Sequence, residues 1–128
     1  MDTAVLKQKI IAKSKEPGID KIGFASAEPF THLEESMRRS KELGHTTGFE
    51  HPVLEERIYP EKIFDTPKTI ISIALAYPTL PKNKPERVKG ERRGAFARAS
   101  WGEDYHFILS RCMEALINYI KEIGRAHV

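Results

Sequence analysis

Cysteine is scarce in this sequence, since Cys112 is the only one among 128 residues. A single thiol excludes a disulfide within the chain, and it cannot by itself hold an iron–sulfur cluster or a zinc site built from several thiolates. Cys112 falls on the apolar stripe of a predicted helix, so we expect it in the core. His45 and His51 have neither a partner cysteine nor a helical i, i+4 pairing, and we expect no metal site there.

Long apolar runs are also missing. No run approaches the roughly 20 residues that a membrane helix needs, and residues 1–16 intersperse lysines among their apolar side chains, unlike a signal peptide. We therefore expect a cytoplasmic protein without a membrane partner. The sequence also has no internal repeat, no Gly-x-Gly-x-x-Gly run and no phosphate-loop motif, so the usual nucleotide-binding folds are not indicated.

Apolar periodicity predicts helices that alternate with strands. The expected helices cover residues 3–14, 31–43 and 103–121, and the expected strands cover residues 19–26 and 69–77. The last helix can be capped by Ser100 or Gly102. The second strand is so continuously apolar that we expect it in the centre of a sheet covered on both sides. This order predicts an α/β fold, with a mixed or parallel sheet covered by helices as an α/β sandwich.

Residues 97–106 carry much of the chemistry of the chain. They read Ala-Arg-Ala-Ser-Trp-Gly-Glu-Asp-Tyr-His and hold the only tryptophan, at the start of the long predicted helix. The carboxylates of Glu103 and Asp104 favour the positive end of the helix dipole. The same backbone amides could instead bind a ligand, with Trp101 and Tyr105 offering flat surfaces to a large planar ring. Spacing alone leaves open whether this is a ligand site or a capped helix with a buried tryptophan and a solvent-facing histidine.

Residues 78–94 form a basic, proline-containing segment between these elements. Six cations against two carboxylates give a local net charge of +4; the cations are Lys82, Lys84, Arg87, Lys89, Arg92 and Arg93. Such a segment could contact phosphate groups, or it could be a solvated connection. It lacks interleaved aromatic residues, so sequence-specific RNA recognition is not indicated.

Arg57 is a further candidate, just before Pro60. Its guanidinium presents several donors in a fixed fork that suits amide and phosphate oxygens. The alternative is a surface ion pair with Glu55 or Glu61, which would add little stability.

Three stretches, in the same order, resemble one enzyme family. Residues 97–106 are similar to the pattern Ser-Arg-Tyr-Ala-Trp-Gly-x-Asp-Tyr-His, although Ala97, Ala99 and Ser100 depart from it. Residues 18–30 follow the run Gly-Phe-Asp-x-Ile-Gly-Phe-Ala-x-Ala-Glu-Pro-Phe with isoleucine in place of the first phenylalanine, and residues 68–78 follow Lys-Ser-Ile-Ile-Ser-x-Ala-x-x-Tyr-Pro with threonine for the first serine. These patterns are those of the epoxyqueuosine reductases, cobalamin-dependent iron–sulfur enzymes that complete queuosine in the tRNA anticodon.

The resemblance implies an oxidoreductase whose N-terminal, corrinoid-binding portion is represented here. The reaction it implies is the reductive removal of the epoxide oxygen from the modified base, with cobalamin and two 4Fe-4S clusters as cofactors. The implied corrinoid contacts are Arg57, Ala97, Arg98, Trp101, Asp104, Tyr105 and His106. The proton donor and the cluster cysteines of the family lie outside this chain, so no catalytic or metal-binding residue is assigned, and we expect the chain alone to be inactive.

The resemblance also makes the anticodon loop of queuosine-family tRNA the expected partner of the basic segment, and a monomer the expected state of the full-length protein. An alternative is a non-catalytic α/β binding module that docks RNA or an acidic partner through residues 82–93. Residues 123–128 match the in-frame translation of a common sequencing adapter. We therefore expect them to be a non-native tail, and residues 1–122 to be an incomplete domain whose natural sequence continues.

Overall fold

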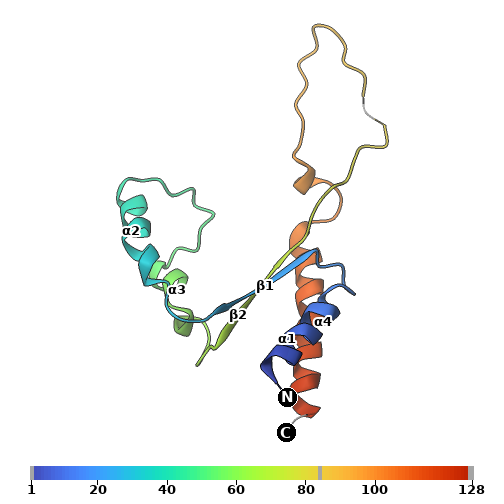
Figure 1. Ribbon diagram of the computed structural model, residues 1–128. Helices are drawn as coiled ribbons and strands as arrows, with labels where there is room; N and C mark the ends of the chain where they lie inside the picture. Colours follow the sequence, from blue (N-terminus) through green and yellow to red (C-terminus); the bar gives the residue numbers. More distant parts are fainter. Residues whose placement is uncertain (1, 84, 127–128) are drawn as a thin grey trace. The chain divides into compact units, whose positions relative to one another are not determined.

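The computed structural model describes residues 2–83 and 85–126, without the side chains of residues 125 and 126. The chain forms two compact units (Figure 1). The inserted unit is Gly23–Ser72, and the terminal unit comprises the chain up to Ile22 and from Ile73 onward. Each unit is described separately below.

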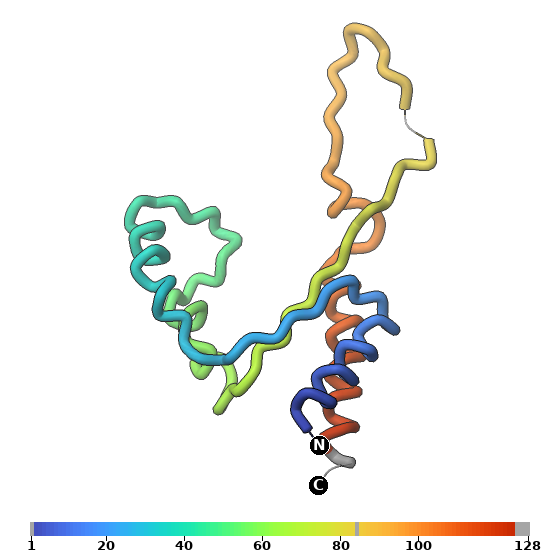
Figure 2. Tube along the Cα trace, viewed as in Figure 1, coloured from blue at the N-terminus to red at the C-terminus, as the bar shows by residue number. Residues whose placement is uncertain are grey.

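The terminal unit is built on two helices, α1 (Thr3–Ser14) and α4 (Tyr105–Ala126), which pack side by side (Figures 1 and 2). Apolar residues recur on one face of each helix and meet in a small core, where Ile10 and Leu116 are buried. Cys112 is also in this core, 3% exposed, and its thiol donates to the carbonyl of Pro17 at 3.4 Å. The prediction that Cys112 is a core residue is confirmed.

A turn joins α1 to the first strand. Its Gly18 has φ +93°, a left-handed conformation that glycine adopts without strain, and the N–H of Ile19 donates to the carbonyl of Ser14 at 3.2 Å. Ile19 is buried behind the turn. The predicted helix over residues 3–14 and its stop at Pro17–Gly18 are both confirmed.

Two strands, β1 (Lys21–Ser26) and β2 (Thr69–Ala74), form the sheet of the described residues. The N–H of Asp20 donates to the carbonyl of Ala74, and the N–H of Ala27 donates to that of Lys68, so the strands run antiparallel. A mixed α/β composition is confirmed. The strand direction differs from the mixed or parallel sheet expected, because the chain leaves β1 and re-enters β2 at the same end of the pair.

The exposure of β2 also differs from expectation. Ile70, Ile71 and Ile73 are half-buried, the other residues of the strand are exposed, and none is buried. Among the described residues β1 is its only neighbouring strand. The prediction of a central strand covered on both faces is therefore wrong for the described part of the chain. An apolar run signals burial but not which segment of a longer chain supplies the cover.

The inserted unit holds two short helices, α2 (Glu34–Glu42) and α3 (Leu54–Ile58). Two 3₁₀ turns accompany them, η1 (Thr31–Leu33) and η2 (Pro60–Lys62). Leu54 and Ile58 form the small core, and the hydroxyl of Tyr59 donates to the carboxylate of Glu34 at 3.1 Å. The hydrogen bond holds the start of α2 next to the end of α3, so that the loop between the helices encloses a space.

Between β2 and α4 the terminal unit carries a long irregular loop, followed by the 3₁₀ turn η3 (Arg98–Ser100) (Figure 2). The loop is exposed over its described residues. No helix in the described part of the chain is both long and apolar enough to span a bilayer.

Candidate functional site

The start of α4 organises the candidate site. Gly102 takes a positive φ of +79°, which turns the chain out of η3 and into the helix. Asp104 is the N-terminal cap: its carbonyl accepts from Phe107 at 3.1 Å, and its carboxylate accepts the N–H of His106 at 2.9 Å. The helix thus begins at Tyr105, two residues after the predicted start, and neither Ser100 nor Gly102 caps it.

Glu103 precedes the cap and so does not lie in the first turn; its side chain binds further along the helix. Its two carboxylate oxygens accept from the guanidinium of Arg111 at 2.6 and 2.8 Å. This paired hydrogen bond holds the pKa of Glu103 below its usual range and raises that of Arg111. The residue preceding the cap is thereby tied to the second turn of α4.

His106 is oriented by its two neighbours. Its ring nitrogen Nδ1 lies 2.7 Å from the Asp104 carboxylate, and its ring stacks on that of Tyr105 with centroids 4.1 Å apart. The backbone N–H of His106, and then its ring, lower the pKa of Asp104. The side chains of Asp104, Tyr105 and His106 are all exposed, so they form part of the surface at the start of α4.

A cavity of about 580 Å³ opens beside this helix start, entirely within the terminal unit. Its walls come from the turn between α1 and β1, the end of β2 and the chain after it, η3, and the first two turns of α4; among the lining residues are Tyr77, Arg98, Trp101, Tyr105, Leu109 and Cys112. Trp101 is 37% exposed, and its indole N–H donates to the carbonyl of Phe96 at 3.1 Å. Tyr105 is 51% exposed. The capped-helix alternative was wrong in expecting a buried tryptophan and right in expecting a capped helix with an exposed histidine. Two aromatic faces remain accessible.

The structure brings together only some of the residues implied for corrinoid binding. Arg98, Trp101 and Tyr105 line the cavity of the terminal unit, whereas Ala97, Asp104 and His106 do not. The carbonyl of Ala97 accepts the N–H of Ser100 at 2.9 Å and so helps to form η3. Arg57 belongs to the inserted unit and lines another cavity there.

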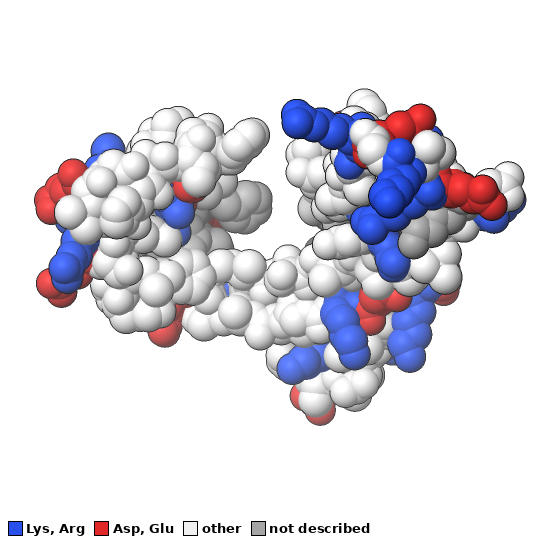
Figure 3. All heavy atoms as spheres, turned by 90° about the horizontal axis from the view of Figure 1, so that it is seen from above, with Lys and Arg blue, Asp and Glu red and all other residues white. Residues whose placement is uncertain are grey.

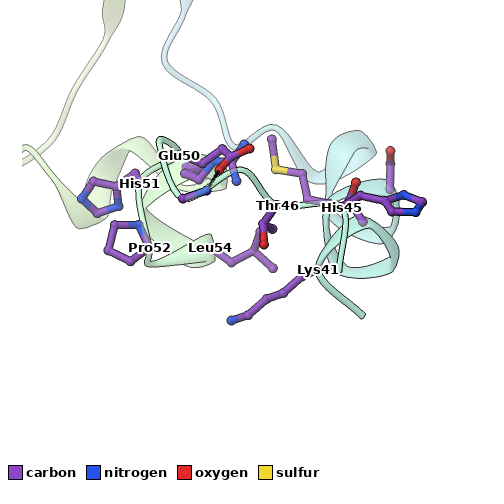
Figure 4. Close-up of a pocket in the computed structure, with 12 residues that line it drawn as sticks. Lys41, His45, Thr46, Glu50, His51, Pro52 and Leu54 are labelled. Atoms are coloured by element: carbon purple, nitrogen blue, oxygen red, sulfur yellow. Dashed lines mark hydrogen bonds between the residues drawn. The ribbon is translucent and has the colours of Figure 1, made fainter. Parts of the chain in front are cut away.

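The cavity of the inserted unit has a volume of about 330 Å³ and lies between α2, α3 and the loop that joins them (Figure 4). Arg57 is half-buried in its wall, and among the described residues its guanidinium has no hydrogen-bond or ion-pair partner. The surface pair with Glu55 or Glu61 that was one alternative for Arg57 is absent from the described structure; Glu55 approaches Arg38 instead, at 3.8 Å. Sequence reasoning missed this cavity, because its residues converge only after folding.

The basic segment is exposed, and Figure 3 shows Lys and Arg side chains gathered on this part of the terminal unit. Arg93 is occupied, since its guanidinium donates to the Glu91 carboxylate at 2.8 Å and to the Glu86 carbonyl at 3.1 Å. The predicted cations without a hydrogen-bond or ion-pair partner among the described residues are Lys82, Arg87, Lys89 and Arg92. Lys84, the remaining candidate, lies outside the described residues.

Comparison with known proteins assigns the chain to a family. Residues 57–128, more than half of the chain, match the family model described as epoxyqueuosine reductase QueG, DUF1730. The chain belongs to the epoxyqueuosine reductase family. It is 52% identical over 121 residues to the epoxyqueuosine reductase of Listeria monocytogenes, covering 94% of this chain and 32% of the relative. The Bacillus subtilis relative is 40% identical over 121 residues, covering 94% of this chain and 31% of the relative. The chain thus spans about a third of the length of these epoxyqueuosine reductases.

Solved structures of epoxyqueuosine reductases share this fold. The Streptococcus thermophilus enzyme matches with a TM-score of 0.83 and 44% identity, over 92% of this chain and 32% of that one. A crystal structure of an epoxyqueuosine reductase with a tRNA-Tyr epoxyqueuosine-modified stem loop matches with a TM-score of 0.86 and 40% identity, over 94% and 32% respectively. The family predicted from the three sequence patterns is confirmed.

Proposed function

We propose that this chain is the cobalamin-binding portion of an enzyme that reduces epoxyqueuosine to queuosine in tRNA. The observation that carries the proposal is the 52% identity to the Listeria epoxyqueuosine reductase over nearly the whole chain. The remaining two thirds of such an enzyme would complete the active site. A non-catalytic binding module is not favoured, because the relatives are named as reductases.

The cavity of the terminal unit fits one side of a corrinoid. A corrinoid is a large planar ring edged with amides, and the cavity offers two accessible aromatic faces, from Trp101 and Tyr105, beside the guanidinium donors of Arg98. A volume of about 580 Å³ suits an edge of the ring rather than the whole cofactor. When bound, cobalamin would supply the reducing chemistry that removes the epoxide oxygen.

The chain's own residues would bind and orient this edge. Trp101 is held in place by the hydrogen bond to the carbonyl of Phe96, so its ring is set before any ligand arrives. Tyr105 is backed by the ring of His106, which Asp104 orients. Asp104 and His106 are therefore positioning residues, and Arg98, Trp101 and Tyr105 are the contacts.

The iron–sulfur clusters require ligands from elsewhere in the longer protein. A 4Fe-4S cluster needs several thiolates, and the single thiol of this chain, that of Cys112, is buried and bonded to the Pro17 carbonyl. The role of this chain is to hold the corrinoid beside the clusters that the rest of the enzyme supplies.

The basic segment is our candidate for contact with tRNA phosphates. Support comes from a related reductase that was crystallised with a modified tRNA stem loop and from the exposed cations of the segment, Lys82, Arg87, Lys89 and Arg92. Contacts of this kind supply affinity without sequence specificity. We assign Arg93 a lesser part, since Glu91 already holds it.

An absorbance titration of the 128-residue chain with cob(II)alamin tests the corrinoid proposal. We expect a saturable spectral change that the Trp101→Ala variant loses. Phe107→Ala is the matched control, because Phe107 is an exposed aromatic residue of the same helix that does not line the cavity. A folded chain that gives no change, or an equal change in all three proteins, would rule out this cavity as the corrinoid contact.

A further inference from the structure

We propose that the cavity of the inserted unit is a binding site for a phosphate group. Two cations of this cavity, Lys41 at the end of α2 and Arg57 in α3, have no partner among the described residues. Figure 4 shows the Lys41 side chain extending from α2 toward Leu54, whereas the ring of His45 points away. Arg57 is half-buried, yet no side-chain nitrogen of the described residues is both buried and unpartnered, so its guanidinium donors stay open to an anion.

The acidic residue in the same wall does not neutralise these cations. The carboxylate of Glu50 accepts the backbone N–H groups of Thr47 and Gly48, each at 3.0 Å, and no ion pair links it to Arg57. Backbone N–H groups lower the pKa of Glu50, so it remains ionised with its lone pairs engaged. His51 is likewise occupied, with Nε2 3.2 Å from the Glu56 carboxylate.

Neutral donors complete the site. Ser36 and Ser40 stand one helical turn apart on α2, and both line the cavity. Leu54 and Pro52 supply an apolar floor. A guanidinium fork from α3, with an ammonium group and hydroxyls from α2, lines one cavity and forms the donor set that recognises a phosphate. Arg57 can donate two hydrogen bonds, and Lys41 acts as a point charge.

Two ligands in the proposed function carry this chemistry as a phosphodiester: the backbone of tRNA and the nucleotide tail of cobalamin. This choice of sources rests on the proposed function, whereas the phosphate site itself rests on the cavity alone. If the nucleotide tail of cobalamin is the source, Arg57 would contact the corrinoid cofactor, as the resemblance implies, through the phosphate of that tail.

A titration of the isotope-labelled 128-residue chain with inorganic phosphate, followed by amide NMR, tests the site directly. We expect saturable shifts confined to residues 36–41 and 45–57, and a Kd at least about tenfold weaker in Lys41→Gln and in Arg57→Gln. Arg39→Gln and Lys62→Gln are the controls, since both are exposed cations of the same unit outside this cavity. Lys41 is exposed, so its variant keeps the test valid if Arg57→Gln unfolds. Shifts spread over the surface, or equal weakening in the controls, would overturn the proposal.

The source is identified with the same Lys41→Gln variant. Weaker binding of cobalamin but unchanged binding of cobinamide, which lacks the nucleotide tail, assigns the tail; weaker binding of an anticodon stem loop alone assigns the RNA backbone. No loss with either ligand would exclude both sources, whereas the titration with inorganic phosphate decides the site itself. The cob(II)alamin titration of Trp101→Ala tests the cavity of the terminal unit. A negative result for the phosphate site can therefore be distinguished from a negative result for the proposed function.

Discussion

The Asp104 carboxylate accepts the backbone N–H of His106 at 2.9 Å and lies 2.7 Å from Nδ1 of the same residue's ring. One side chain thus caps α4 and sets the ring that stacks on Tyr105. Helix capping and the presentation of an aromatic face are therefore coupled through a single carboxylate, and the two roles can be separated by substitution.

Replacing Asp104 tests this coupling. Asparagine caps a helix about as well as aspartate, whereas alanine is poor, so we expect Asp104→Asn, which loses only the charge, to lower the midpoint of thermal unfolding less than Asp104→Ala does. Both variants remove the charge beside Nδ1 of His106, and both should weaken cobalamin binding less than Trp101→Ala does. Circular dichroism melts and the absorbance titration measure the two effects. Equal melts for the two variants would contradict the capping role.

The decrease in the free energy of unfolding at acidic pH should depend on the protonation of Asp104. Its folded-state pKa is held below the usual 3.8 by the N–H and ring of His106, so the unfolded state binds the proton more tightly. The stabilisation is complete above about pH 4 and is lost as the pH falls through the folded pKa. An NMR titration that follows the His106 amide should give a midpoint below 3.8. A midpoint at or above that value would show that the hydrogen bonds do not favour the carboxylate.

The core between α1 and α4 predicts a contrast between two neighbouring residues. Leu116 is 4% exposed and Ile117 is 47% exposed. We expect Leu116→Ala to lower the free energy of unfolding by about 2–5 kcal/mol and Ile117→Ala to lower it by much less. Urea unfolding of both variants measures the difference. Similar losses for the two would mean that this face of α4 is not the one packed on α1.

The basic segment predicts a contrast between adjacent arginines. Arg92 has no hydrogen-bond or ion-pair partner among the described residues, whereas the Arg93 guanidinium donates to the Glu91 carboxylate. We expect Arg92→Gln to weaken binding of an anticodon stem loop and to reduce the slope of log K against log salt by about 0.7–0.9, the contribution of one phosphate contact. Arg93→Gln should change the slope less. Filter binding across a salt series measures the slope for each variant. A larger change for Arg93→Gln than for Arg92→Gln would contradict the prediction.

The sequence predicted well where a signal is local. The bounds of α1, the core position of Cys112 and the long helix α4 all follow from apolar spacing and from the Pro17–Gly18 stop. The cap at Asp104 was misplaced because Ser100, Gly102 and Asp104 are all residue types that cap helices well.

Features that depend on distant segments could not be predicted in this way. Apolar runs carry no strand direction, so the antiparallel pairing of β1 with β2 was not foreseeable from them. The cavity around Arg57 forms only when α2, α3 and the loop between them fold together, and Lys41 and Glu50 carry no motif that marks them. The corrinoid contacts were proposed from the family resemblance; of these residues, the cavity of the terminal unit is lined by Arg98, Trp101 and Tyr105.

The most direct test of the account is a chimera in which residues 1–122 replace the matching third of the Listeria monocytogenes epoxyqueuosine reductase, with which the chain shares 52% identity. Purified chimera, assayed by mass spectrometry of tRNA nucleosides, should convert epoxyqueuosine to queuosine, and the Trp101→Ala chimera should lose most of this activity. A folded chimera that carries its iron–sulfur clusters and binds cobalamin, yet leaves epoxyqueuosine unchanged, would contradict the proposed function.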